Sequence, residues 1–158
     1  MTTAKRLGFT KEETAKVVNP LNELLCNYHV HYQKLRNFHW NVKGGDFFDL
    51  HENFELLYDM AKLNIDEIAE RIRVFNHTPI STLKEYLEKS TIKEVGTDLS
   101  GDKMVEEVMD DFENLLTYLV ASTEAASEIG DVGTIDLINN IIKGMEKKHW
   151  MLRSFLEK

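Results

Sequence analysis

The segment that decides the fold is HWNVKGGDFFDLHENFE, residues 39–55. It holds two histidines, two glycines, a tryptophan and several carboxylates. The pair Gly44-Gly45 interrupts the helical pattern on both sides, because glycine leaves the backbone free to leave the helix. The segment therefore predicts a turn between two helices. It is either a packing corner or half of a metal site whose other half lies elsewhere.

The helix before this turn carries apolar residues at intervals of three and four, the spacing of one helical face. They are Leu21, Leu24, Leu25, Tyr28, Tyr32, Leu35 and Phe38. Three interpretations of the first part of this helix remain open. The sequence TKEE at 10–13 has the pattern of a capping box. Alternatively, the helix restarts with Asn19 as N-cap and Pro20 at its first position, or Pro20 kinks one long helix.

Three further long helices follow the turn, each with an apolar stripe of the same spacing. The stripes comprise Phe54, Leu57, Ala61, Ile65, Ile68, Ile72 and Phe75; Val105, Val108, Phe112, Leu115, Leu119 and Val120; and Ile135, Ile138, Ile141, Ile142, Met145, Leu152 and Phe155. Residues 81–89 predict a short helix capped by Ser81, residues 91–101 predict a loop, and Thr134 is the predicted cap of the last helix. No convincing strand pattern appears. We expect an all-α, antiparallel four-helix bundle with a short extra helix in the middle connection.

The composition suits one domain over residues 1–158, with 42% hydrophobic and 29% charged residues. No apolar run approaches the roughly twenty residues of a membrane span, and the N-terminus lacks the apolar stretch of a secretory signal. We therefore expect a cytoplasmic protein, with residues 1–9 as a short, mobile tail. Cys26 is the only cysteine, which excludes an intramolecular disulfide, and its apolar surroundings predict a buried thiol.

The formal net charge of −8 argues against nucleic-acid binding, because a surface of that sign repels phosphate. One modest group of basic residues lies near the N-terminus and is diluted by acidic neighbours. It indicates a solvated chain end at least as well as a DNA-binding arm. The basic residues are Lys5, Arg6, Lys11 and Lys16, with Glu12 and Glu13 among them.

A di-iron site inside the bundle is poorly supported. Such sites use Glu-x-x-His on two helices, and this chain has that spacing only at Glu146 and His149. His149, beside Trp150, is better explained as a packing or capping residue near the end of the last helix.

The second long helix carries two pairs of possible metal ligands. His51 and Glu55 are four residues apart, as are Asp66 and Glu70, so each pair projects from one helix face. Eleven residues separate Glu55 from Asp66, about three turns, so both pairs face the same way. They are roughly 16 Å apart along the helix axis at about 1.5 Å per residue. One ion therefore cannot contact both pairs of the same chain.

A second copy of the helix brings the pairs together. With a two-fold axis midway between residues 60 and 61, His51 lies opposite Glu70 of the other copy, and Glu55 lies opposite Asp66. His39 folds back over the glycine turn to add a second imidazole. Two imidazoles and three carboxylates suit iron or another borderline divalent metal. The alternative is a solvated acidic face with incidental spacing.

These residues resemble the Dps mini-ferritins, also called DNA-binding proteins from starved cells. The matching motifs are HWNVKG at 39–44, LHENFELLYD at 50–59, DEIAERI at 66–72, GDVGTIDL at 130–137 and EKKHWMLRSFL at 146–156. The resemblance covers nearly the whole chain. It implies a ferritin-like bundle assembled as a hollow homo-dodecamer that oxidises Fe²⁺ between two-fold-related subunits, preferably with hydrogen peroxide, and stores the ferric product.

By motif, the resemblance implies catalytic iron ligands from two subunits, with up to two iron ions per site. They are His39, His51 and Glu55 of one subunit and Asp66 and Glu70 of the other. The family usually has Asp where this chain has Glu55, which shifts that carboxylate by about one methylene. Trp40 is expected beside the site.

The resemblance also implies roles for four further acidic residues. Glu52 and Asp59 are candidates for nucleating the ferric mineral, and Asp131 and Asp136 for lining the pores through which Fe²⁺ enters. For each, an ordinary solvated carboxylate is an equally good interpretation.

Two other functions compete with the ferroxidase hypothesis. One is compaction of DNA, which the family name suggests. The short tail of mixed charge and the acidic shell predict weak or absent DNA binding at physiological salt. The other is a helical scaffold whose metal site is inactive.

Overall fold

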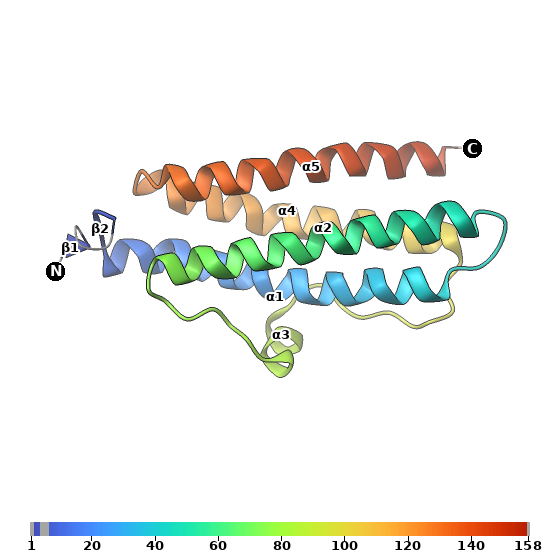
Figure 1. Cartoon of the computed structure of the whole chain (residues 1–158), viewed down its shortest axis with the longest axis horizontal. Helices are drawn as coiled ribbons and strands as arrows, with labels where there is room; N and C mark the ends of the chain where they lie inside the picture. Colours follow the sequence, from blue (N-terminus) through green and yellow to red (C-terminus); the bar gives the residue numbers. More distant parts are fainter. Residues whose placement is uncertain (1, 4–6, 158) are drawn as a thin grey trace.

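The computed structural model describes residues 2–3 and 7–157. Four long helices form the bundle: α1 (Lys11–Asn41), α2 (Phe47–Val74), α4 (Gly101–Glu128) and α5 (Val132–Leu156). The short helix α3 (Leu83–Lys89) lies in the long connection from α2 to α4 (Figure 1). The pairs α1–α2 and α4–α5 are antiparallel hairpins, and the long connection makes α2 and α4 run the same way. The predicted all-α bundle with an extra helix in its middle connection is confirmed.

Two very short strands were not predicted. β1 (Thr2–Thr3) pairs antiparallel with β2 (Phe9–Thr10). Each strand has two residues, which is too short for an alternating pattern to be visible. Part of the expected tail, residues 1 and 4–6, lies outside the described residues, as do the basic residues Lys5 and Arg6.

Helix α1 is one continuous helix that begins at the capping box. The backbone N–H of Glu13 donates to Thr10 Oγ1 (3.1 Å), and the N–H of Thr10 donates to Glu13 Oε2 (2.7 Å). Pro20 lies inside the helix, so the restart at Asn19 is wrong. Proline costs a helix one backbone hydrogen bond. Burial of the α1 stripe offsets this cost, because Val17 and Leu21 on either side are fully buried.

The ends of α3 and α4 differ slightly from expectation. Thr82, not Ser81, caps α3: its hydroxyl accepts from the N–H of Glu85 (3.4 Å), whereas Ser81 Oγ donates to the carbonyl of Pro79. Gly101, expected in a loop, is the first residue of α4, whose N-cap is Ser100. In both places neighbouring residues can serve as caps, and tertiary packing selects one.

The connection that carries α3 is held to α1 by one buried amide. Asn27 Oδ1 accepts from the backbone N–H groups of Thr91 (3.0 Å) and Ile92 (3.0 Å) and from Ser90 Oγ (3.1 Å). Asn27 is fully buried, so these bonds replace solvent for the polar groups of the turn after α3.

Cys26, on the same side of α1, is a buried free thiol, as predicted. Burial raises its pKa to about 11, so it is not a reactive thiolate. Among the helices of the described part, none has the length and apolar character that crossing a membrane requires.

Candidate metal centre

The turn between α1 and α2 is tight and depends on glycine. Gly44 has φ +103°, a conformation that side chains disfavour. The N–H of Phe47, the first residue of α2, donates to the carbonyl of Gly44 (3.1 Å). The last turn of α1 therefore lies against the first turn of α2, as the sequence predicts.

This geometry brings His39 and His51 into a reciprocal arrangement. His39 Nδ1 donates to the backbone carbonyl of His51 (2.7 Å), and His51 Nδ1 donates to the carbonyl of His39 (2.7 Å). The rings stack with centroids 3.8 Å apart and planes 17° from parallel. A carbonyl only accepts, so each Nδ1 carries a hydrogen, and in each neutral ring Nε2 keeps its lone pair. A hydrogen bond that fixes the tautomer in this way is typical of metal-binding histidines.

Two aromatic side chains that the sequence analysis did not single out enclose the histidine pair. The ring of Phe47 stacks on His51 (centroids 5.0 Å apart), and Tyr58 meets His39 edge-on (5.3 Å). The Tyr58 hydroxyl donates a long hydrogen bond to Glu55 Oε1 (3.5 Å). Desolvation and the nearby carboxylates of Glu55 and Asp59 raise the pKa of Tyr58, so its hydroxyl remains a donor. In the sequence, Phe47 lies one helical turn before His51 and Tyr58 lies two turns after it. This spacing was the signal that could have indicated both aromatic residues.

The remaining predicted ligands lie on the exposed face of α2. Glu55, Asp66 and Glu70 are all exposed. Within the described part of this single chain, no three His, Cys, Asp or Glu side chains gather in a geometry that holds a metal ion. The chain thus brings together His39 and His51 but does not bring Asp66 or Glu70 to them.

The other predicted residues near the site lie at the surface of the chain. Glu52 and Asp59 are exposed on α2. Trp40 follows His39 and is 57% exposed, with the Arg36 guanidinium 4.9 Å from its ring centroid. That contact is a cation–π interaction at the surface.

The start of α5 differs from expectation. Asp131, not Thr134, is the N-cap: its Oδ1 accepts from the N–H of Thr134 (3.1 Å) and from Arg71 Nη2 (2.6 Å). The Thr134 hydroxyl accepts from Arg71 Nε (2.9 Å) instead. Asp131 is 1% exposed, so in this chain its carboxylate does not face solvent as the predicted lining of an iron entry pore would. Asp136 is exposed.

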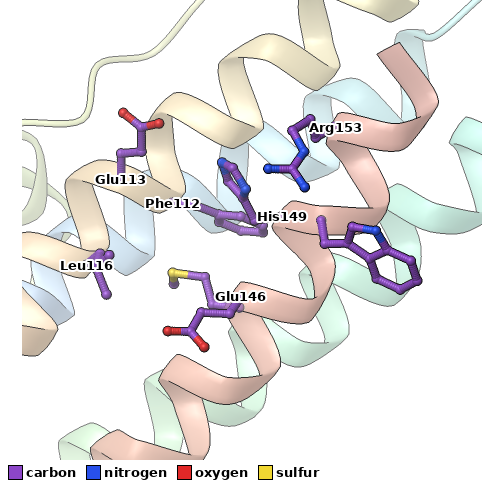
Figure 2. A pocket seen from close by; sticks show the side chains of 8 residues that line it. Phe112, Glu113, Leu116, Glu146, His149 and Arg153 are labelled. Atoms are coloured by element: carbon purple, nitrogen blue, oxygen red, sulfur yellow. The ribbon is translucent and has the colours of Figure 1, made fainter. Parts of the chain in front are cut away.

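The single Glu-x-x-His spacing lies beside a groove between α4 and α5. Figure 2 shows Glu146 and His149 on α5, with Glu113 of α4 and Arg153 near the same groove. The groove has a volume of about 360 Å³ and a largely apolar lining that includes Phe112, Leu116, Met145 and Trp150. His149 packs here with its neighbour Trp150, near the end of the last helix.

Comparison with known proteins gives one consistent result. Residues 18–158 match the family described as the ferritin-like domain. The chain is 45% identical over 141 residues to DNA protection during starvation protein 2 of Bacillus anthracis, covering 89% of this chain and 97% of that protein.

Two solved structures are similar along almost their whole length. A Dps protein of Vibrio cholerae O1, described as a member of a broad superfamily of ferritin-like diiron-carboxylate proteins, has a TM-score of 0.93 and 38% identity, covering 96% of this chain and 95% of that one. A Dps protein of Bacillus brevis has a TM-score of 0.90 and 42% identity, covering 94% and 100%.

Proposed function

Because the chain belongs to the Dps family of ferritin-like proteins, we propose that it is a ferroxidase and iron-storage mini-ferritin of the cytoplasm. In this proposal it oxidises Fe²⁺, preferably with hydrogen peroxide, at sites shared by two subunits. It stores the ferric product in a hollow dodecamer and so protects the cell against oxidative stress.

The observation that carries the proposal is the histidine pair. Both Nδ1 atoms of His39 and His51 are fixed by backbone carbonyls, which leaves both Nε2 atoms to bind iron. Glu55 lies one turn further along α2 on the same face, and its longer side chain reaches toward Tyr58. Three ligands on one chain make half a site, and the two-fold arrangement supplies Asp66 and Glu70 from the partner.

The exposed face of α2 supports a two-fold partner independently of its acidic residues. Leu56 (48% exposed) and Leu63 (66%) lie on one flank of this face, and the partly buried Ile65 and Tyr58 lie on the other. A two-fold axis midway between residues 60 and 61 keeps each flank on its own side, so Leu56 comes near the partner's Leu63 and Tyr58 comes near the partner's Ile65. Each exposed leucine thus meets an apolar partner, which is the self-complementarity that a two-fold interface needs.

The proposed chemistry balances without a free radical. Two Fe²⁺ ions each give one electron to one molecule of hydrogen peroxide, which takes up two protons and leaves as two water molecules. The carboxylates stabilise the higher charge of Fe³⁺, and the imidazoles suit the borderline Fe²⁺ substrate. Glu52 and Asp59 remain candidates for nucleating the mineral, and Asp136 for the entry path. The buried Asp131 is better explained as a helix cap.

The test is peroxide-dependent oxidation of Fe²⁺ by the wild type and by the variant His51→Ala with Asp66→Ala. We expect the wild type to oxidise two Fe²⁺ per peroxide and the variant to lose at least about tenfold in rate, since each half-site loses a ligand. The matched control is His149→Ala with Glu146→Ala, which likewise removes one histidine and one carboxylate, but from the α4–α5 groove. A variant as fast as the wild type, or an inactive wild type, would favour the scaffold hypothesis.

The second candidate function is DNA binding, which the name of the Bacillus anthracis relative suggests. Lys11 and Lys16 are exposed near the start of α1, but Glu12 beside them is exposed too. We expect weak or absent binding in a gel-shift assay at physiological salt, because phosphate contacts are screened there. A shift that persists at that salt would make DNA compaction the better hypothesis.

A further inference from the structure

A second group of charged residues lies inside the bundle, between α1 and α4. Lys34 Nζ donates to Asp111 Oδ1 (2.8 Å) and to Glu107 Oε2 (2.9 Å). His31 Nδ1 donates to the other carboxylate oxygen of Asp111 (2.9 Å). The side chains of Lys34, His31 and Asp111 are only 4%, 2% and 6% exposed, and that of Glu107 is 35% exposed. The network is therefore closed off from solvent except at Glu107.

Stability alone is a poor explanation for this network. Removing charges from water is costly, and a buried ion pair seldom stabilises a fold more than apolar residues of the same volume. The chain nevertheless places an ammonium between two carboxylates in its core.

The two groups that hold the Lys34 ammonium are of a type that can bind metal ions. The carboxylates of Glu107 and Asp111 both lie within 2.9 Å of Lys34 Nζ, and the His31 imidazole contacts only the second oxygen of Asp111. Carboxylates and an imidazole on facing helices are the donors with which four-helix bundles bind iron and manganese. A small cavity of about 20 Å³ lies beside His31 and is lined by Tyr28 and Asn64 as well, but not by Lys34, Asp111 or Glu107.

We propose that Lys34 is the tethered occupant of a cation site inside the bundle and that it excludes divalent metal from this site. A divalent ion could enter only by displacing the ammonium, which would then be buried without a carboxylate partner. Lys34 is thus a specificity-determining residue: it leaves the exposed face of α2 as the place where metal binds.

The test replaces Lys34 and asks whether metal takes its place. The parent protein carries His51→Ala and Asp66→Ala, so that the α2 ligands do not contribute. Lys34→Met is added, which keeps the length of the side chain and removes its charge. The probe is Co²⁺ alone, followed by calorimetry, by visible absorption and by the melting temperature.

We expect Lys34→Met to bind one Co²⁺ per chain, at least about tenfold more tightly than the parent. Co²⁺ at roughly a hundredfold above Kd should raise the melting temperature of this variant by about 5 °C or more and leave that of the parent unchanged. Adding Asp111→Asn should abolish both effects, because it removes one of the two charged ligands.

Lys34→Gln provides a second variant that keeps donors toward both carboxylates, in case Lys34→Met folds poorly without metal. The proposal is overturned if neither variant binds more Co²⁺ than the parent, if neither folds with or without Co²⁺, or if Asp111→Asn leaves binding intact. Iron oxidation is not measured, so the result is independent of the proposed ferroxidase function.

Discussion

The proposed two-fold arrangement of α2 predicts an ion pair between subunits that a charge reversal can test. Asp59 and Lys62 are both exposed and lie at equal distances on either side of the proposed axis. Asp59 of one subunit therefore faces Lys62 of the partner, and symmetry makes this contact twice. An exposed ion pair contributes about 0.2 to 1 kcal/mol. Asp59→Lys turns two attractions into two repulsions of similar size, so it should cost about 0.8 to 4 kcal/mol per dimer, a factor of about 4 to 800 in Kd.

The dimer Kd of each variant can be measured by analytical ultracentrifugation at low ionic strength. Asp59→Lys and Lys62→Asp should each weaken the dimer, and the double variant should restore it, because the pair is re-formed with opposite polarity. High salt should reduce all three differences. Glu124→Lys, an exposed change of equal charge on α4, is the control. A double variant as weak as the single ones would refute the proposed register of the two helices.

Three further predictions concern the fold and the site. Asn27→Ala should lower the free energy of unfolding in urea by about 2 to 4 kcal/mol, because two backbone N–H groups and a hydroxyl lose their acceptor; an unchanged value would contradict this role. Burial lowers the pKa of His29 from 6.5 to about 4, so between these pH values the unfolded chain binds a proton that the folded chain does not. Stability should therefore be complete above pH 6.5 and fall toward pH 4, and His29→Gln should flatten this part of a plot of melting temperature against pH. Glu55→Asp shortens the side chain and removes its contact with Tyr58. In steady-state assays of Fe²⁺ oxidation, the KM for Fe²⁺ should rise about 2- to 5-fold while kcat stays nearly unchanged. Complete inactivity would show instead that the length of Glu55 is essential.

The helices were predictable because their stabilising interaction is periodic. Each long helix buries a stripe at intervals of three and four residues, and Gly44 marks the corner between the first two. The exact caps were less predictable. Ser81 and Thr82 are adjacent and chemically alike, and Asp131 precedes Thr134 by one turn. The choice between them depends on contacts such as that of Arg71, more than fifty residues away in sequence.

The histidines of the site were predictable from spacing, but their environment was not. The reciprocal bonds of His39 and His51 run to backbone carbonyls, and nothing in the residue types indicates such bonds. The Lys34 network was missed for another reason. His31 and Lys34 interrupt the apolar stripe of α1, and Asp111 interrupts that of α4 beside Phe112. Polar residues at core positions were the available signal, since a buried charge requires a partner.

Both polar clusters contain histidine and carboxylates, but their hydrogen bonds differ, and this contrast supports the proposal that iron binds at His39 and His51. Around Lys34 both carboxylates accept from the ammonium, and Asp111 also accepts from the His31 imidazole, so these groups are hydrogen-bonded within one chain. Around His39 and His51 the backbone fixes one nitrogen of each ring. Within the described part of the chain, the other nitrogens and the carboxylates of α2 do not gather around one point. Iron chemistry needs donors that the fold holds in place but does not satisfy. In the proposed assembly those donors, His39 of α1 and the ligands of α2, lie where a second copy would cover them.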